Sequence, residues 1–391
     1  MAFTLDQLTR IPVVMGIISE YNAPGSTFSR FYKLGLTDRA GQTLNRRTGT
    51  YDVFAPTRSM PVGRAPQAGP SRVARKPVGQ KIITVARFYE SLEITYENVF
   101  GRRPLGGQFG TVDAQGASYI SHQIKHETAK FYNMHEFLAF QMMRGGWSYI
   151  AENGGEDLYP VIKGTPESVM DVDTLVPASH QGQLPVGEGG SDIIDTSWDD
   201  PDCQIIDQMH ELDKIHAVRN GNPLKHIWLN GTTIKHLYNN TQLRSVGGDA
   251  YTLFETLSNR EKDPNQIYPD TGYDVVFRAL PQWRFHVYNQ AYIPGLVSET
   301  EAAQTDMANI RYFIPDGEAI ITPSPGDWCE KVVGSEPVQF MPTEKPRIAS
   351  GFVMGRTFDI EPPRVDLKFL ENYAPVITQK NAVYNPTVIF S

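Results

Sequence analysis

Residues 113–144 have the sequence DAQGASYISHQIKHETAKFYNMHEFLAFQMMR, and this stretch decides the fold. Its large apolar side chains recur three, four or seven residues apart, which is the spacing of one face of a helix. They are Ile120, Ile124, Phe131, Met134, Leu138 and Met142. Asp113 suits an N-cap, and Gly145-Gly146 follows the last turn. We therefore predict a single helix, about 45 Å long at 1.5 Å per residue, around which the rest of the chain is built.

The sequence before this helix is dense in Pro and Gly turn formers. Two runs, 49–55 and 80–89, are rich in β-branched and aromatic residues, and five prolines lie between them in residues 56–79. We predict an N-terminal arm over residues 1–45 and an extended β-hairpin over residues 46–95 with a polar, basic tip. Because an isolated hairpin is only marginally stable in water, we expect this front part to have no core of its own and to need the surface of a sibling molecule.

The sequence after the helix alternates between helix and strand signals. Aromatic runs on either side of Gly-Gly-Glu predict a short hairpin over residues 147–162, and a polar, Gly-rich connector follows at 176–192. A mixed α/β unit is expected next, with helices at 201–218 and 232–238 and strands at 225–229, 274–277, 284–288, 310–314 and 319–322. The tail, from residue 364 to residue 390, predicts two strands joined by a turn. The chain is thus expected to belong to the α+β class.

Charge divides the chain into two parts. The first 110 residues hold 15 Lys and Arg against 7 Asp and Glu, whereas the remainder holds 21 against 37. The formal net charge of −8 argues against a dedicated nucleic-acid binder. A basic front and an acidic body attract each other, within one chain or between copies.

The basic hairpin tip carries the residues that we single out as candidate inter-subunit contacts: Arg64, Arg72, Arg75 and Lys76. A solvated loop, a phosphate-binding loop and a loop that docks onto an acidic neighbour are the alternatives. Docking is favoured because the same chain supplies the acidic body, and because no base-stacking element accompanies the loop.

No motif in the sequence predicts catalysis. His122 and His126 have the four-residue spacing of metal ligands, but Gln123 and Lys125 stand where a zinc protease would need Glu. Phosphate-binding and nucleophile-elbow motifs are absent, and Cys203 and Cys329 are expected to be buried free thiols. We therefore expect no catalytic residue, no cofactor and no metal. No apolar stretch is long enough to span a membrane, so a soluble protein made in the cytoplasm is expected.

The order of these elements resembles the lambda-type major capsid proteins of tailed bacteriophages (the phage major capsid protein E family), which share the Hong Kong 97-type shell fold. Five local sequences carry the resemblance: residues 73–80 at the end of the hairpin, the helix with the hairpin 147–162, residues 195–201, residues 313–321, and the tail segments 374–377 and 388–390. It covers nearly the whole chain in order. The fold implied has the N-terminal arm, the extended loop, a peripheral domain (96–190) with the spine helix 113–144, an axial domain (191–345), and return strands of the peripheral domain (346–391).

The resemblance implies a function as well as a fold. It implies a major capsid protein, not an enzyme, that assembles with itself into hexamers and pentamers of an icosahedral head around double-stranded DNA. The protein would be made in the host cytoplasm and found in the virion. About 45 residues precede the hairpin, so a separate scaffolding protein is expected, with a portal, a decoration protein and non-specific contact with packaged DNA. A tail or other structural protein, a carbohydrate-binding protein, and an α/β enzyme without a recognisable motif remain the alternatives.

Overall fold

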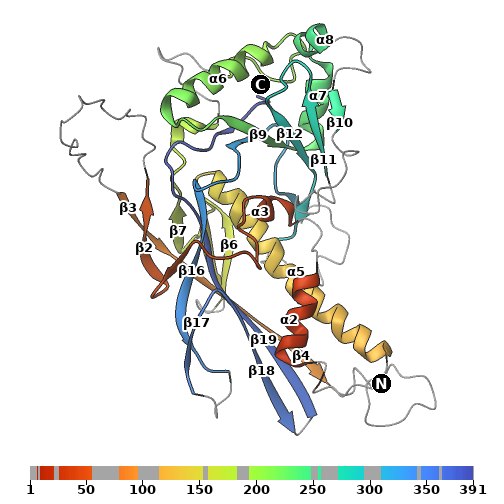
Figure 1. Cartoon of the computed structure of the whole chain (residues 1–391), viewed down its shortest axis with the longest axis vertical. Helices are drawn as coiled ribbons and strands as arrows, with labels where there is room; N and C mark the ends of the chain where they lie inside the picture. Colours follow the sequence, from red (N-terminus) through yellow and green to blue (C-terminus); the bar gives the residue numbers. More distant parts are fainter. Residues whose placement is uncertain are drawn as a thin grey trace, which may run out of the picture.

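The computed structural model describes residues 7, 9–21, 26–54, 79–95, 114–152, 157–182, 193–247, 254–256, 272–294, 310–340, 345–360 and 363–390. The molecule is elongated, with a sheet of long strands at one end and an α/β unit at the other (Figure 1). One long helix, α5 (Ala114–Met143), lies along the sheet and reaches the α/β unit. The α+β class is confirmed, and the hairpin, the long helix, the short hairpin and the α/β unit follow one another in the expected order.

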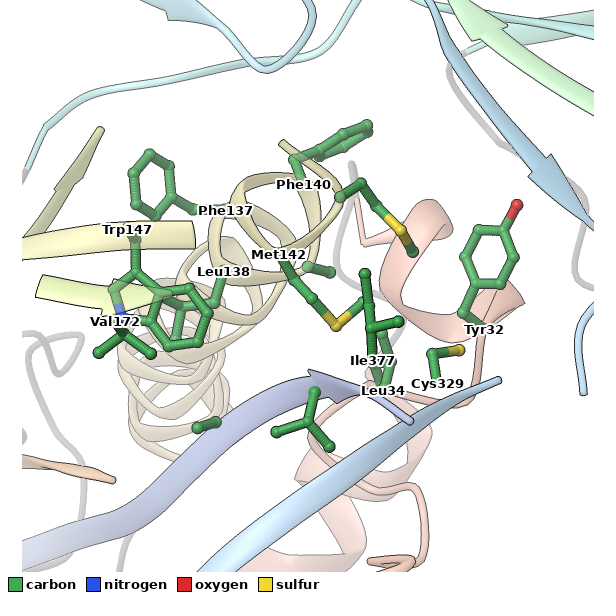
Figure 2. Packing of buried hydrophobic residues seen from close by; sticks show 14 of the residues in the cluster. Tyr32, Leu34, Phe137, Leu138, Phe140, Met142, Trp147, Val172, Cys329 and Ile377 are labelled. Atoms are coloured by element: carbon green, nitrogen blue, oxygen red, sulfur yellow. The ribbon is translucent and has the colours of Figure 1, made fainter. Parts of the chain in front are cut away.

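Helix α5 agrees with the predicted spine helix, but its burial changes along its length. In its first half, the buried stripe runs through Ile120 and Ile124, whereas residues 135–143 are buried on every side. Figure 2 shows these last turns with Trp147 on one side and Leu34 and Ile377 on the other. The helix ends before two glycines with positive φ, and a Cβ at Gly146 would lie 2.0 Å from the carbonyl oxygen of Val172. Only a glycine at position 146 therefore allows the strand that follows α5 to pair closely with the strand that contains Val172.

A six-stranded sheet packs against α5. Its strands are β1 (Gln42–Leu44), β4 (Ala86–Thr95), β16 (Cys329–Val338), β17 (Arg347–Ser350), β18 (Phe352–Ile360) and β19 (Pro363–Ile377). Alternate side chains of β19, namely Val365, Leu367 and Phe369, are buried in one cluster with Ile120 and Ile124 of α5. The side chains on one face of β19, which recur every two residues, therefore pack against the apolar stripe of α5.

This sheet corrects two expected boundaries. Residues 86–95, assigned to the hairpin, instead pair along the length of β19, because the backbone leaves the hairpin at Val85. Residues 329–338, assigned to the axial unit, also belong to this sheet, because 329–333 pair with β19 and 335–338 pair with β17. Both strands have ordinary strand composition, and only their long-range pairing shows where they lie.

The predicted hairpin is present as β2 (Thr48–Val53) and β3 (Gly79–Thr84). The expectation that the front part needs the surface of a sibling molecule is wrong for its described residues, because they pack against the body of the same chain. Helix α2 (Ile11–Glu20) buries Val14 and Ile18 against the spine helix and sheet, and Tyr51 and Ile83 of the hairpin are buried in the main core. These apolar side chains are few and widely spaced, yet each contacts the same chain.

The predicted short hairpin is also found. Strands β5 (Gly146–Glu152) and β6 (Asp157–Ile162) are antiparallel, and β7 (Met170–Asp173) adds to the other edge of β5. A 3-10 turn, η2 (Ala178–His180), and the two-residue strand β8 (Gln181–Gly182) begin the connector to the second unit.

The second unit contains a five-stranded sheet with helices on one face. Its strand order is β10 (Phe254–Thr256), β11 (Gly272–Phe277), β12 (Arg284–Tyr288), β9 (Leu224–Leu229) and β15 (Ile320–Pro323). Helices α6 (Ile205–Arg219), α7 (Gly231–Asn239) and α8 (Thr241–Gly247) accompany it, and the ribbon β13 (Ala291–Tyr292) with β14 (Arg311–Tyr312) lies beside it. On β9, Ile227 and Leu229 belong to the cluster that includes α6 and α7, whereas Trp228 belongs to the main core. Strand β9 is therefore buried on both faces.

The C-terminal residues 378–390, here called the C-terminal strap, leave β19 and cross to the second unit. Tyr384 exchanges backbone hydrogen bonds with Ile321 of β15, and Val388 accepts one from Trp198. The strand β20 (Asn385–Pro386) pairs with β8. The last residues, expected to return to the peripheral sheet, instead close the second core, because the apolar side chains of Tyr384 and Val388 are buried there.

Two smaller expectations can be compared with the structure. Cys203 and Cys329 are buried free thiols, as predicted. Among the described residues, no helix combines the length and the apolar character needed to cross a membrane.

We predict that Tyr384→Ala lowers the free energy of unfolding by about 3–5 kcal/mol, as truncation of a large buried aromatic side chain does. Tyr384 is 1% exposed, and its ring stacks on His180 with centroids 4.0 Å apart. Urea denaturation measures the loss. Tyr312→Ala, at a tyrosine that is 54% exposed, is the matched control and should change stability by less than about 0.5 kcal/mol. Equal losses in the two variants would show that the strap does not hold the second unit.

Candidate functional site

The four expected contact residues, Arg64, Arg72, Arg75 and Lys76, lie outside the described residues, so their role stays a prediction. The base of the same hairpin is described. Arg47 lies 2.9 Å and Arg87 3.1 Å from the carboxylate of Glu336 on β16. Part of the attraction between the basic front and the acidic body therefore acts within one chain.

The best-built polar site of the described chain surrounds residues 26–36, here called the N-terminal plug. The plug contains helix α3 (Thr27–Phe31) and lies where the spine helix meets the five-stranded sheet. Phe28 stacks on Phe140 of α5 at 3.9 Å between centroids and meets Trp228 of β9 edge-on at 4.8 Å. The Tyr32 hydroxyl accepts a hydrogen bond from the Trp228 indole at 3.0 Å. The plug thus joins the spine helix to the second unit through aromatic contacts.

Glu136 of α5 holds the beginning of the plug. Its carboxyl group is fully buried and accepts the backbone N–H groups of Phe28 and Ser29, both at 2.8 Å. The Tyr288 hydroxyl of β12 donates to the same carboxyl at 2.6 Å. Burial raises the pKa of Glu136 to about 7, and the hydrogen bonds offset only part of that rise. One carboxyl group therefore binds three elements together.

His135, the neighbouring residue on α5, holds the end of the plug. Its Nδ1 lies 2.8 Å from the carbonyl oxygen of Leu34, and its Nε2 lies 2.7 Å from the buried Glu371 of β19. The Leu34 carbonyl oxygen can only accept, so Nδ1 is the donor in that hydrogen bond. Lys331 of β16 donates to the carbonyl oxygens of Gly35 and Leu36 at 2.8 and 3.0 Å.

Lys331 and His135 flank the same carboxylate. The Lys331 ammonium lies 3.6 Å from the other oxygen of Glu371, an ion-pair contact longer than a hydrogen bond. Burial lowers the pKa of Lys331, and Glu371 opposes that change. Buried charges are tolerated when they are paired and hydrogen-bonded in this way.

The polarity of the site matches that of the plug. A carboxyl group faces the N–H groups at the start of α3, and the nitrogen donors of His135 and Lys331 face the carbonyl oxygens after its end. This arrangement complements the helix dipole. Because the contacts are to backbone atoms, the site can hold and position a segment of chain.

A second buried polar chain lies beside the plug on the five-stranded sheet. His226 Nδ1 lies 2.8 Å from His286 Nε2, and His286 Nδ1 lies 2.6 Å from Asp274. Burial, reinforced by His286, lowers the pKa of His226 to about 2, so His226 is neutral. The Phe31 ring contacts both imidazoles. These contacts give a hydrogen-bond partner to each of the buried polar side chains on the sheet face that Phe31 covers.

Sequence reasoning missed all the charged residues of this site. His135 and Glu136 interrupt an apolar helical run, and Glu371 stands on the core side of β19, two residues beyond Phe369. Charged residues at core positions were the available signal. His122 and His126, which were considered as ligands, are exposed on α5. Within the described ranges, no group of three or more His, Cys, Asp or Glu side chains is placed to hold a metal ion.

Comparison with solved structures places this fold. The chain is similar to a phage-related protein from Bordetella bronchiseptica RB50, with a TM-score of 0.50, 8% identity, and 99% of this chain and 97% of that chain covered. It has the fold of that phage-related protein. A putative prophage capsid protein from E. coli CFT073 follows at a TM-score of 0.49, 12% identity and 99% coverage of both chains. The capsid of Ralstonia phage GP4 has a TM-score of 0.45 and 11% identity, with 95% of this chain and 93% of that chain covered. No protein-family model and no curated protein sequence matches.

We predict that Glu371→Gln lowers the free energy of unfolding by about 3–5 kcal/mol, because it leaves His135 and Lys331 buried without their carboxylate. Thermal or urea denaturation measures the loss. The control is Glu93→Gln: Glu93 is 52% exposed and lies 3.7 Å from Arg364, so its removal should cost less than about 1 kcal/mol. A loss below 1 kcal/mol in Glu371→Gln would show that the buried pairing does not hold the plug.

Proposed function

We propose that this chain is a major capsid protein, the repeating subunit of an icosahedral phage head that encloses double-stranded DNA. The observation that carries the proposal is the fold, which is shared over nearly the full length with a phage-related protein. The proposed role is structural, and its main partner is another copy of the same chain, in hexamers and pentamers. The six-stranded sheet with α5 would form the peripheral domain, and the five-stranded sheet with its helices the axial domain.

The hairpin supplies a surface suited to such contacts. Its two strands pair so that Tyr51 and Ile83 lie on the face that is buried against the body. Ile82 lies on the opposite face and is 69% exposed, and Phe54, at the end of the pairing, is 45% exposed. An apolar side chain in the middle of a Thr-rich face favours cover by another molecule. A contact between subunits through two apolar side chains is weak by itself, but a closed lattice repeats that contact many times.

The basic tip would add direction to these contacts. Arg47, next to the hairpin strand β2, and Arg87 of β4 already pair with Glu336 within the chain. Arg64, Arg72, Arg75 and Lys76 would dock onto the acidic body of a neighbour. Complementary charge sets register and orientation more than affinity.

The proposal extends to further partners and to location. A separate scaffolding protein, a portal, a decoration protein and non-specific contact with packaged DNA complete the set, with no membrane partner. The protein would be made in the host cytoplasm and found in the virion. Size-exclusion chromatography and negative-stain electron microscopy of the purified chain test the central statement: closed particles support it, whereas fibres or only small soluble species under all assembly conditions would refute it.

We predict that reversing three charges of the tip, Arg72→Glu, Arg75→Glu and Lys76→Glu, blocks shell formation while circular dichroism shows a folded chain. The same change in net charge at three exposed residues of the second unit, Lys214→Glu, Lys235→Glu and Arg278→Glu, is the control and should still assemble. Normal shells from the tip variant would remove the tip from the interface. Failure of both variants would assign the effect to net charge.

We predict that Ile82→Ser leaves the stability of the single chain within about 0.5 kcal/mol of the wild type but raises the protein concentration needed for assembly. The neighbouring Ile83→Ser is the opposite case, because Ile83 is 5% exposed and its change should destabilise the chain itself. Urea denaturation and light scattering against concentration measure the two effects. An unchanged assembly concentration for Ile82→Ser would contradict the prediction.

A further inference from the structure

We propose that the cavity at the start of α7 binds a neutral sugar. The cavity has a volume of about 480 Å³ and is open to the surface of the second unit. This volume lies within the range of about 300–1,000 Å³ that small-molecule sites occupy. The residues that would meet the ligand come from the start of α7, the end of β12 and the stretch 312–316: Gly231, Thr232, Lys235, Asn289, Tyr312 and Asp316.

Two asparagines build the floor of this cavity. Asn230 Oδ1 accepts hydrogen bonds from the backbone N–H and the hydroxyl of Thr233, both at 2.8 Å. Asn289 Oδ1 accepts the backbone N–H of Gly231 at 2.6 Å, which leaves Asn289 Nδ2 as a donor. A Cβ at Gly231 would lie only 2.9–3.0 Å from the Asn289 amide, so the glycine keeps that amide in place. Two of the helix N–H groups that an anion would need are therefore already used.

The ribbon of β13 and β14 presents one aromatic ring to the cavity. Tyr292 lies on the inner face of the ribbon, with its ring 5.0 Å from Phe137 and 4.9 Å from Phe313. Tyr312 comes directly before Phe313 and pairs with Ala291, so its side chain lies on the opposite, outer face. It is 54% exposed and lines the cavity. A rigid aromatic ring with a polar tip suits a sugar, whose ring has both apolar C–H faces and hydroxyl groups.

The charged groups of the lining have opposite signs. Lys235 is exposed, and no described residue forms an ion pair with it. Asp316 uses one carboxylate oxygen for the side-chain amide of Asn230, and no described residue donates to the other oxygen. An ammonium group only donates and a carboxylate only accepts, whereas a sugar hydroxyl does both. The balance of one positive and one negative charge favours a neutral ligand over an anion or a cation.

The affinity for a single sugar is expected to be low. The cavity is open, so a bound sugar keeps part of its surface in water, and we expect a dissociation constant on the order of 1 mM. In a shell every subunit would carry one such site, and a surface that bears many glycans would be held at many points. That consequence rests on the proposed function, whereas binding by the single chain does not.

Saturation-transfer difference NMR of the purified, unassembled full chain tests the site. The probes are the methyl glycosides of glucose, galactose, mannose and N-acetylglucosamine, and inorganic phosphate is added as the competing anion. We expect at least one glycoside to bind with a dissociation constant on the order of 1 mM and to stay bound when phosphate is added. Displacement by phosphate, or no saturation transfer to any of the glycosides at about 10 mM, overturns the proposal.

Two variants locate the binding. Tyr312→Ala removes the ring, and Asp316→Asn replaces the free acceptor while it keeps the contact with Asn230, so each should raise the dissociation constant about tenfold. Tyr89→Ala, at a tyrosine of β4 that is 45% exposed, is the matched control and should bind like the wild type.

Circular dichroism checks that all three variants fold. Unchanged affinity in both cavity variants would overturn the proposal. Binding is read on unassembled chain, so the two proposals can fail separately. Sugar binding by a protein that never forms shells would refute the proposed function alone, and shells from a chain that binds no sugar would refute the sugar site alone.

Discussion

The structure depends on how two ionisable side chains are accommodated at the buried end of the spine helix. Residues 135–143 of α5 are surrounded by protein, yet the first two of them are His135 and Glu136. Burying such groups without partners costs several kcal/mol each. The N-terminal plug supplies backbone N–H groups to Glu136 and a backbone carbonyl to His135, and β19 supplies Glu371. The N-terminal plug is thus needed to supply hydrogen-bond partners to the buried polar side chains of the spine helix.

This dependence also explains what the sequence could and could not predict. Helix α5, the hairpin 147–162, α6, β9 and α7 were predicted because their periodicity and turn residues are local. Strands β4 and β16 were assigned to the wrong units, because a strand pattern shows which face is buried but not which strand lies beside it. The same limit misplaced the C-terminal strap, whose partner β15 precedes it by more than sixty residues.

The polar site was beyond prediction for a related reason. The partners of Glu136 are the backbone N–H groups of Phe28 and Ser29, and every residue type offers such groups. No side-chain pattern near residue 28 marks that segment as the partner of a glutamate 108 residues later. The sequence could show an unusual charge at a core position, but only the fold shows what satisfies it.

The N-terminal plug and the C-terminal strap both join the two units of the structure. The units have separate cores, one around the spine helix and one between the five-stranded sheet and its helices. Phe28 of the plug contacts Trp228 of the five-stranded sheet. The strap runs from the end of β19 to the same sheet, where Tyr384 forms backbone hydrogen bonds with Ile321. The strap is held by hydrogen bonds between backbone groups, whereas the plug is held by hydrogen bonds from its backbone to the side chains of Glu136, His135 and Lys331. The two units are thus joined at two places, by segments that lie more than 300 residues apart in the sequence.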